Sequence, residues 1–143
     1  MPPEDSARAR LALAFVIHSD SFEKVHYALA AASAAAAVGR PVILFFAMGA
    51  VRSLARGAGW HRLRTAEGKP AERVDAGYRD SGVADFETLL AACRDLGVRL
   101  MVCEMGLRVE GLDGGDLRSE LDFEEGGLAT LMMEIGEGNI VFI

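Results

Sequence analysis

Several residue types that mark particular classes of protein are scarce in this sequence of 143 residues. It contains two cysteines and three histidines, and the cysteines, Cys93 and Cys103, lie ten residues apart. This spacing is neither a CxxC redox pair nor a metal-ligand pair, and two cysteines are too few for the disulfide framework of a small secreted domain. We therefore expect no metal site and no disulfide, and a location in the reducing cytoplasm.

Basic charge and nucleotide-binding motifs are also missing. Fifteen lysines and arginines stand against 21 aspartates and glutamates, which gives a formal net charge of -6. Such a chain has no basic field to hold a phosphate backbone. No GxxxxGK[ST] loop occurs, and no GxGxxG follows the first apolar segment. We therefore expect neither a nucleic-acid partner nor a bound cofactor.

No segment is apolar for long enough to span a bilayer. The longest apolar stretch, residues 27–51, is cut by Gly39-Arg40-Pro41 into pieces that are too short. The first ten residues, MPPEDSARAR, are polar and charged, unlike a secretory signal. We interpret residues 1–10 as a disordered or frayed leader and 11–143 as a single domain without a membrane segment. Hydrophobic residues make up 51% of the chain, enough for a sizeable core.

Apolar runs of strand length alternate with helical patterns along the whole chain. We predict strands at 11–17, 41–48, 98–103, 121–123 and 140–143, and helices at 20–38, 50–56, 85–96, 104–109 and 128–135. This alternation predicts an α/β fold, a three-layer sandwich around a mostly parallel five-stranded sheet. The alanine-rich helix at 20–38 could pack closely on the sheet, on another helix or on a second subunit.

The segment 57–83 breaks this alternation. It is polar, contains glycine and has no clear period, although it carries Trp60, His61 and Tyr78. A loop of this length in a compact domain is usually a functional lid or a disordered insert. The aromatic residues favour a lid.

Cys103 is the main candidate for chemistry. It closes the apolar run that begins at Val98, and reactive groups of open α/β sheets gather at the carboxyl ends of strands. The helix predicted after it would favour its thiolate. His18 ends the first strand and could act at the same edge as a base or cation, or could simply cap backbone groups. Cys93 lies on an apolar helical stripe and is interpreted as a buried hydrophobe.

Other cysteine and strand-end chemistries do not fit the spacing. A phosphatase loop needs an arginine six positions after the cysteine, whereas Arg108 is five positions after Cys103. A phospho-accepting receiver domain needs an acidic residue where Cys103 stands, and no PxxTxxC of a thiol peroxidase occurs. A thiolate that accepts sulfane sulfur as a persulfide requires only access, a low pKa and a partner that docks correctly.

Three long segments resemble the DsrE/DsrF-like family of sulfur-transfer proteins. They are LALAFVIHSDSFEKVHYALAAASAAAAVGRPVILFFAMGAV, FETLLAACRDLGVRLMVCEMGLRVEGL and GGLATLMMEIGEGNIVFI. The resemblance implies a flavodoxin-like fold, assembly into homo-trimers or hexamers, and an active cysteine at the position of Cys103. It also implies protein partners that donate and accept sulfur, of the TusA-like or rhodanese-like kind.

Two hypotheses of different classes follow. In the first, the protein is a cytoplasmic sulfur carrier that holds a persulfide on Cys103, with assistance from His18. In the second, it is a non-catalytic homo-oligomeric binding or scaffold module of the same fold, with Cys103 buried at a strand end. An accessible Cys103 favours the first hypothesis, and a sealed Cys103 favours the second.

Overall fold

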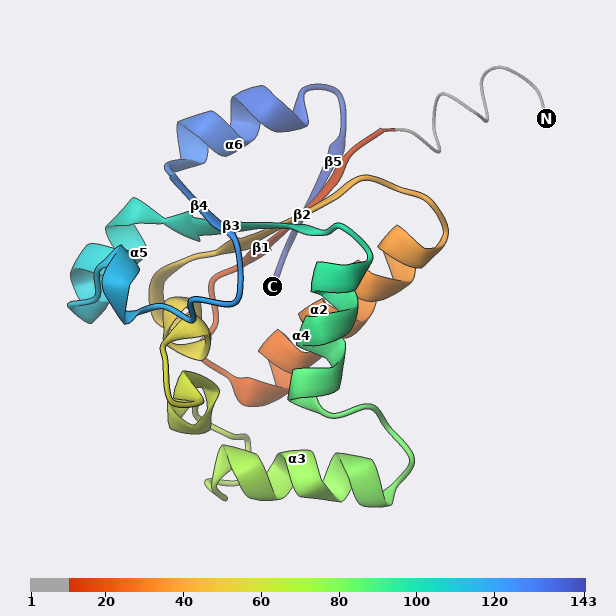
Figure 1. The fold of residues 1–143 in the computed structure, drawn as a ribbon, viewed down its shortest axis with the longest axis vertical. Helices are drawn as coiled ribbons and strands as arrows, with labels where there is room; N and C mark the ends of the chain where they lie inside the picture. The colour runs from red at the N-terminus through yellow and green to blue at the C-terminus, as the bar shows by residue number, and fades with distance from the viewer. Residues whose placement is uncertain (1–10) are drawn as a thin grey trace.

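The computed structural model describes residues 11–143, which form a five-stranded sheet with helices on both faces (Figure 1). The sheet has the strand order β4-β3-β2-β1-β5, and each neighbouring pair is parallel. The strands are β1 (Leu13–Ile17), β2 (Val42–Phe46), β3 (Arg99–Cys103), β4 (Phe123–Gly126) and β5 (Asn139–Phe142). The predicted three-layer α/β fold is confirmed, with a sheet that is parallel throughout. The leader expected at 1–10 lies outside the described residues.

The strand order explains why different helices cover the two faces. From β1 to β4 each new strand is added on the same side of the last, and then β5 returns to pair with β1. Because crossovers between parallel strands are right-handed, this reversal moves the connecting helix to the opposite face. Accordingly α2 (Phe22–Ala37) and α4 (Phe86–Asp95) lie on one face and α6 (Leu128–Ile135) on the other (Figure 1). We call these the α2–α4 face and the α6 face.

The hydrophobic core is divided by the sheet into two clusters. The larger cluster, on the α2–α4 face, is rich in aromatic residues, and Trp60 lies 4.9 Å from Phe86 and 5.6 Å from Phe22 between ring centroids. The smaller cluster lies on the α6 face. It consists of the strand side chains that point to this face and of Leu131 and Ile135 of α6. Cys103 belongs to this smaller cluster.

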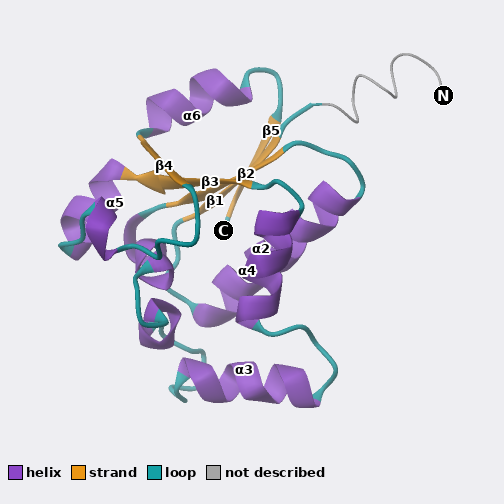
Figure 2. Cartoon of the chain, viewed as in Figure 1, coloured by secondary structure: helices purple, strands orange, loops and turns teal. Residues whose placement is uncertain are grey.

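The segment 57–83 is not the long loop that the sequence predicted. It contains the 3₁₀ helix η2 (Gly59–Arg62) and the helix α3 (Ala71–Asp80), and Trp60 is 4% exposed (Figure 2). Asp75 of α3 is buried and accepts the backbone N–H of Phe86 at 2.8 Å. Because its apolar residues pack on the α2–α4 face, the segment does not cover Cys103, and the lid prediction is wrong for this structure.

Two element boundaries also differ from the prediction. The edge strand was predicted at 121–123, but β4 runs from Phe123 to Gly126 and includes Glu124 and Glu125. An edge strand tolerates these carboxylates because its outer side faces solvent. Helix α2, predicted to begin at residue 20, begins at Phe22 and is capped by Ser21, whose hydroxyl accepts the N–H of Lys24 at 3.3 Å. Asp20 instead binds two arginines.

Candidate functional site

Cys103 and His18 lie in the same row at the carboxyl edge of the sheet. Ile17 pairs with Phe46, and Phe46 pairs with Val102. The next residues of β1 and β3, His18 and Cys103, therefore share a row, in which side chains point to the same face. One strand, β2, runs between them, so their backbones are separated by about two strand spacings, roughly 10 Å.

The Cys103 thiol is covered. Its side chain is 2% exposed, in the small cluster beneath α6. Cys103 directly precedes α5 (Glu104–Glu110), but its side chain accepts no hydrogen bond from the first turn of that helix. The predicted position, at a strand end before a helix, is confirmed. In this structure the thiol is nearly closed to solvent.

Cys93 is buried, as the sequence predicted, and lies on the opposite face of the sheet from Cys103. It is 0% exposed, and its thiol donates to the carbonyl oxygen of Leu29 at 3.4 Å. Burial raises the pKa of the Cys93 thiol to about 12, because the charged thiolate loses its hydration there. Both cysteines are free, and Cys93 is an inert structural residue in this environment.

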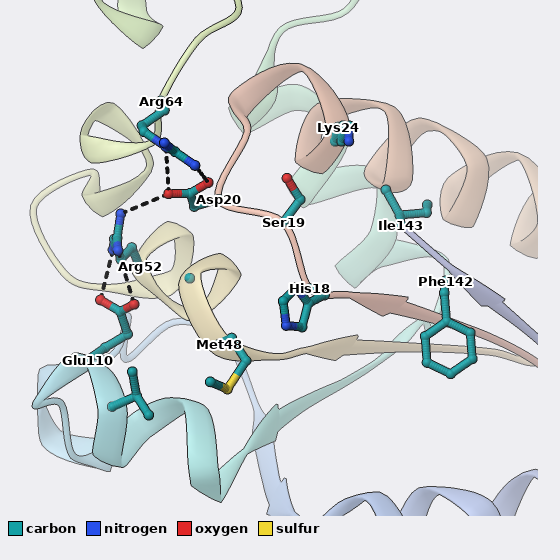
Figure 3. A pocket seen from close by; sticks show the side chains of 12 residues that line it. His18, Ser19, Asp20, Lys24, Met48, Arg52, Arg64, Glu110, Phe142 and Ile143 are labelled. Carbon is teal, nitrogen blue, oxygen red and sulfur yellow. Dashed lines mark hydrogen bonds and ion pairs between the residues drawn. The ribbon is translucent and has the colours of Figure 1, made fainter.

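A cavity of about 630 Å³ opens at the carboxyl edge beside β1 (Figure 3). We call it the switch-point cavity, because it lies at the ends of β1 and β5, where the strand order reverses. Ligands of open α/β sheets bind at such reversals. Cys103 is not among the residues that line it, which are His18, Ser19, Asp20, Lys24, Met48, Gly49, Arg52, Arg64, Val109, Glu110, Phe142 and Ile143.

Four charged side chains form a continuous chain of ion pairs along one wall of the cavity (Figure 3). Arg64 binds both carboxylate oxygens of Asp20 at 2.9 Å. Arg52 reaches the same carboxylate at 3.4 Å and binds Glu110 at 2.8 and 3.2 Å. The chain joins the turn after β1, the 3₁₀ helix η1 (Met48–Leu54), the segment after η2, and α5.

The ion pairs shift the pKa values of Asp20, Arg52 and Arg64 in the direction that favours their charged forms. The hydrogen bond from Arg64, helped by the charge of Arg52, lowers the pKa of the Asp20 carboxyl below its ordinary value. Glu110 raises the pKa of Arg52, and Asp20 raises that of Arg64. The wall is therefore a fixed arrangement of two cations and two anions.

The turn after β2 has the unusual backbone that brings η1 against the cavity. Met48 has φ = 46°, in the left-handed region that few residues other than glycine adopt. A Cβ on the next residue, Gly49, would lie 2.7 Å from Cβ of Asp20, so only glycine fits there. A Cβ on Gly106 of α5 would lie 2.6 Å from the backbone nitrogen of Met48. These two glycines let β1, η1 and α5 approach closely.

Only one of the two predicted site residues lines the cavity. His18 is exposed there, and its backbone N–H donates to the carbonyl oxygen of Ile143 at 2.8 Å. The sequence did not predict Arg52, Arg64 or Glu110, because they come from separate segments with no common motif. Asp20 stands at the start of the helix predicted at 20–38, and nothing in that pattern indicated its two arginine partners.

A search of residues 11–143 finds no three His, Cys, Asp or Glu side chains grouped as a metal site would require. Over the same range, no helix has the length and apolar character needed to cross a membrane. The chemistry available at this edge of the sheet is therefore that of the thiol, the imidazole, the lysine and the paired charges.

Two solved structures share this fold. A protein of unknown function, MTH1491 from Methanobacterium thermoautotrophicum, matches with a TM-score of 0.63 at 16% identity, over 92% of this chain and 98% of that chain. The ychN protein from E. coli matches with a TM-score of 0.56 at 15% identity, over 94% of this chain and 99% of that chain. At such identities the likeness shows the fold alone. No curated protein matches the sequence significantly.

The family comparison covers the strands, the helices and the residues of the carboxyl edge together. The model of the DsrE/DsrF-like family matches residues 1–142, which includes Cys103 and the lining of the switch-point cavity up to Phe142. The chain belongs to the DsrE/DsrF-like family.

Proposed function

We propose that this protein is a sulfur carrier in which Cys103 holds sulfane sulfur as a persulfide and relays it between partner proteins. Family membership supports this, since the resemblance implies an active cysteine at this position. The observation that carries the proposal is the location of Cys103 as the last residue of β3, at the edge where open α/β sheets place reactive groups.

The proposed transfer is an exchange between sulfur atoms. The Cys103 thiolate attacks the outer sulfur of a donor persulfide, a new S–S bond forms at Sγ, and the donor leaves as a thiolate with the electrons of the broken S–S bond. An acceptor thiolate then removes the outer sulfur in the same way. No oxidant is consumed. His18, in the same row, is proposed to act as a base or cation near the incoming donor.

Loading has to begin with a local opening, because Cys103 is 2% exposed. We assign this opening to α6, an eight-residue helix that buries only Leu131 and Ile135 against the sheet. Elements with few buried contacts open at the lowest free-energy cost. Docking of a partner on the α6 face would then supply the energy for exposing the thiol.

The partners in this proposal are sulfur donor and acceptor proteins, TusA-like or rhodanese-like, in the cytoplasm. We also propose a homo-oligomer, a trimer or hexamer. Exposed apolar side chains on α6 support an interface there, namely Met133 at 83% exposed, Met132 at 45% and Leu128 at 41%. Clustered exposed apolar residues commonly mark interaction surfaces.

The test is intact mass after incubation with thiosulfate or polysulfide, on wild type, Cys93→Ser and Cys103→Ser. We expect a reducible gain of one sulfur in wild type and Cys93→Ser, and none in Cys103→Ser. Cys93→Ser is the matched control, because it removes the other buried thiol. If Cys103→Ser gains as much sulfur as wild type, the proposed site is wrong.

The second candidate function is a non-catalytic homo-oligomeric binding or scaffold module. The burial of Cys103 favours it, because a sealed thiol at a strand end can be purely structural. Alkylation by iodoacetamide under native conditions separates the two functions. A Cys103 that reacts well before global unfolding supports the carrier, and a Cys103 that reacts only on unfolding supports the binding module.

A further inference from the structure

The switch-point cavity has no role in the proposed sulfur relay, because Cys103 does not line it. Its volume of about 630 Å³ lies within the range of small-molecule sites. It also occupies the position in the fold where open α/β sheets bind ligands. Its size and its place both point to a small-molecule ligand.

The polar groups that remain free in the cavity are donors. Arg52 and Arg64 are already paired with Asp20 and Glu110. Within residues 11–143 the ammonium group of Lys24, an exposed residue, has no ion-pair partner, and the imidazole of His18 is exposed. The hydroxyl of Ser19 accepts one N–H, from Ser21, and keeps its proton for a ligand.

Two backbone donors at the end of β1 are already paired. The N–H groups of His18 and Ser19 both donate to the main-chain oxygen of Ile143, at 2.8 and 3.4 Å. At this end of β1, recognition of a ligand therefore depends on side chains. A free ammonium, an imidazole and a hydroxyl on one side of a cavity are complementary to an anionic group.

The lining of the cavity also includes apolar side chains. Phe142 and Val109 are 66% and 62% exposed, and Met48 lines the cavity while packing against the α6-face cluster. Figure 3 shows Met48 and Phe142 on either side of His18. Met48 keeps a side chain at a backbone position, φ = 46°, where glycine would be less strained.

We infer that the switch-point cavity binds a small organic anion whose charged group is held by Lys24, His18 and Ser19 and whose apolar part packs on Met48 and Phe142. The charged group is a phosphate or a carboxylate. The ion-paired wall of Arg64, Asp20, Arg52 and Glu110 gives the cavity its shape. This site is independent of Cys103 and of sulfur transfer.

The test is NMR of methyl-labelled methionine during titration with phenyl phosphate. Met48 lines the cavity, whereas Met132 and Met133 lie on α6, so each methyl signal reports on one surface. We expect the Met48 signal, assigned with Met48→Leu, to shift and saturate at millimolar phenyl phosphate while the α6 signals stay in place. Benzoate replaces phenyl phosphate in a second titration and distinguishes a phosphate site from a carboxylate site.

Two further ligands and one pair of lysine variants test whether the cavity recognises both parts of the anion. Inorganic phosphate keeps only the charged group and benzyl alcohol keeps only the aromatic ring. We expect each to bind at least about fivefold more weakly than phenyl phosphate. Lys24→Gln should lower the affinity for phenyl phosphate by about fivefold or more.

Lys69→Gln is the matched control, since Lys69 is the only other lysine and lies outside the cavity. The affinity of this variant for phenyl phosphate should stay within about twofold of wild type.

Several results would overturn the inference. These are an unmoved Met48 signal with both aromatic anions, affinity for benzyl alcohol equal to that for phenyl phosphate, or equal losses in Lys24→Gln and Lys69→Gln. The titration is repeated on Cys103→Ser. Binding that survives there supports this site even if the sulfur-relay proposal fails, and binding that disappears contradicts the independence of the two sites.

Discussion

The two faces of the sheet are covered to very different depths. On the α2–α4 face two helices pack on the strands, and η2 and α3 add aromatic residues outside them (Figure 2). On the α6 face, within residues 11–143, one short helix contributes Leu131 and Ile135 and leaves Met133 exposed. The α2–α4 face, the deep face, therefore holds most of the buried apolar packing. In the proposed function the α6 face, the thin face, is the one that opens.

The two cysteines show what this difference means for chemistry. Cys93 lies under the deep cover, where burial raises the pKa of its thiol to about 12 and its proton is held by Leu29. Cys103 is nearly as buried, but under the thin cover and at the edge of the sheet. The two thiols therefore differ in the depth of their cover and hardly at all in their exposed area.

The largest loss of stability should come from a substitution in the core of the deep face. Phe86→Ala removes a ring that is 0% exposed and stacks on Trp60 at 4.9 Å. We expect the free energy of unfolding to fall by about 3–5 kcal/mol, measured by urea denaturation. The control is Met133→Ala on the exposed side of α6, which should change stability by less than about 0.5 kcal/mol. Equal losses would contradict the difference between the faces.

Removing a buried side chain of α6 should lower stability less, but should speed the alkylation of the Cys103 thiol. Leu131→Ala empties a fully buried position in the cluster that contains Cys103. We expect a loss of about 2–3 kcal/mol in unfolding free energy and a clear rise in the native alkylation rate of Cys103. Peptide mass mapping after a short iodoacetamide pulse measures that rate.

The control for this experiment is Leu90→Ala, an equally buried leucine on α4, the helix that carries Cys93. We expect it to lower stability by a similar amount without speeding the alkylation of Cys103. If both variants expose both cysteines equally, the protein opens only by global unfolding, and the thin face has no special role.

The sequence predicted the fold well where local patterns were strong. The apolar run that ends at Cys103 and the stripe from Phe86 to Cys93 gave correct elements, because each residue's burial follows from its place in the period. Helix α3 was missed because Val74 and Tyr78 are its only large apolar residues, too few to show a period. Its burial depends on Trp60 and Phe22, which are distant in sequence.

The candidate site could be predicted only in part, for a similar reason. His18 and Cys103 were found because a strand end is visible in a sequence. The ion-pair chain from Arg64 to Glu110 joins four segments, and no spacing rule relates them. The depth of cover over Cys103 was equally invisible, since it depends on which face each crossover helix takes.

The ion pairs of Asp20 with Arg52 and Arg64 should make part of the protein's stability depend on pH. Arg64 and Arg52 hold the pKa of Asp20 below its unfolded value, so the stabilisation is present above about pH 4 and is lost as the pH falls through the folded value. We expect Asp20→Asn to cost about 1 kcal/mol at pH 7 and less at pH 3, by urea denaturation at each pH.

The control for the pH series is Asp80→Asn, an exposed carboxylate at the end of α3. Its unfolding free energy should follow that of wild type at every pH. A gap between Asp20→Asn and wild type that stays constant from pH 7 to pH 3 would mean that the ion pairs with Arg64 and Arg52 add nothing to stability.

The smallest loss of stability should come from breaking the ion pairs between α6 and the sheet. Arg99 of β3 binds Glu124 of β4 at 2.8 and 2.9 Å and Glu134 of α6 at 2.5 Å, and so ties α6 to the sheet. These groups are partly exposed, so we expect Arg99→Gln to lower the free energy of unfolding by only about 0.5–1 kcal/mol, and by less in high salt.

The control is Arg94→Gln, which breaks an exposed ion pair with Asp95 on α4. If α6 is the cover that opens, Arg99→Gln speeds alkylation of Cys103 and Arg94→Gln does not, although both remove one surface arginine. An equal rate in the two variants would show that the thiol is reached by a route that leaves α6 in place.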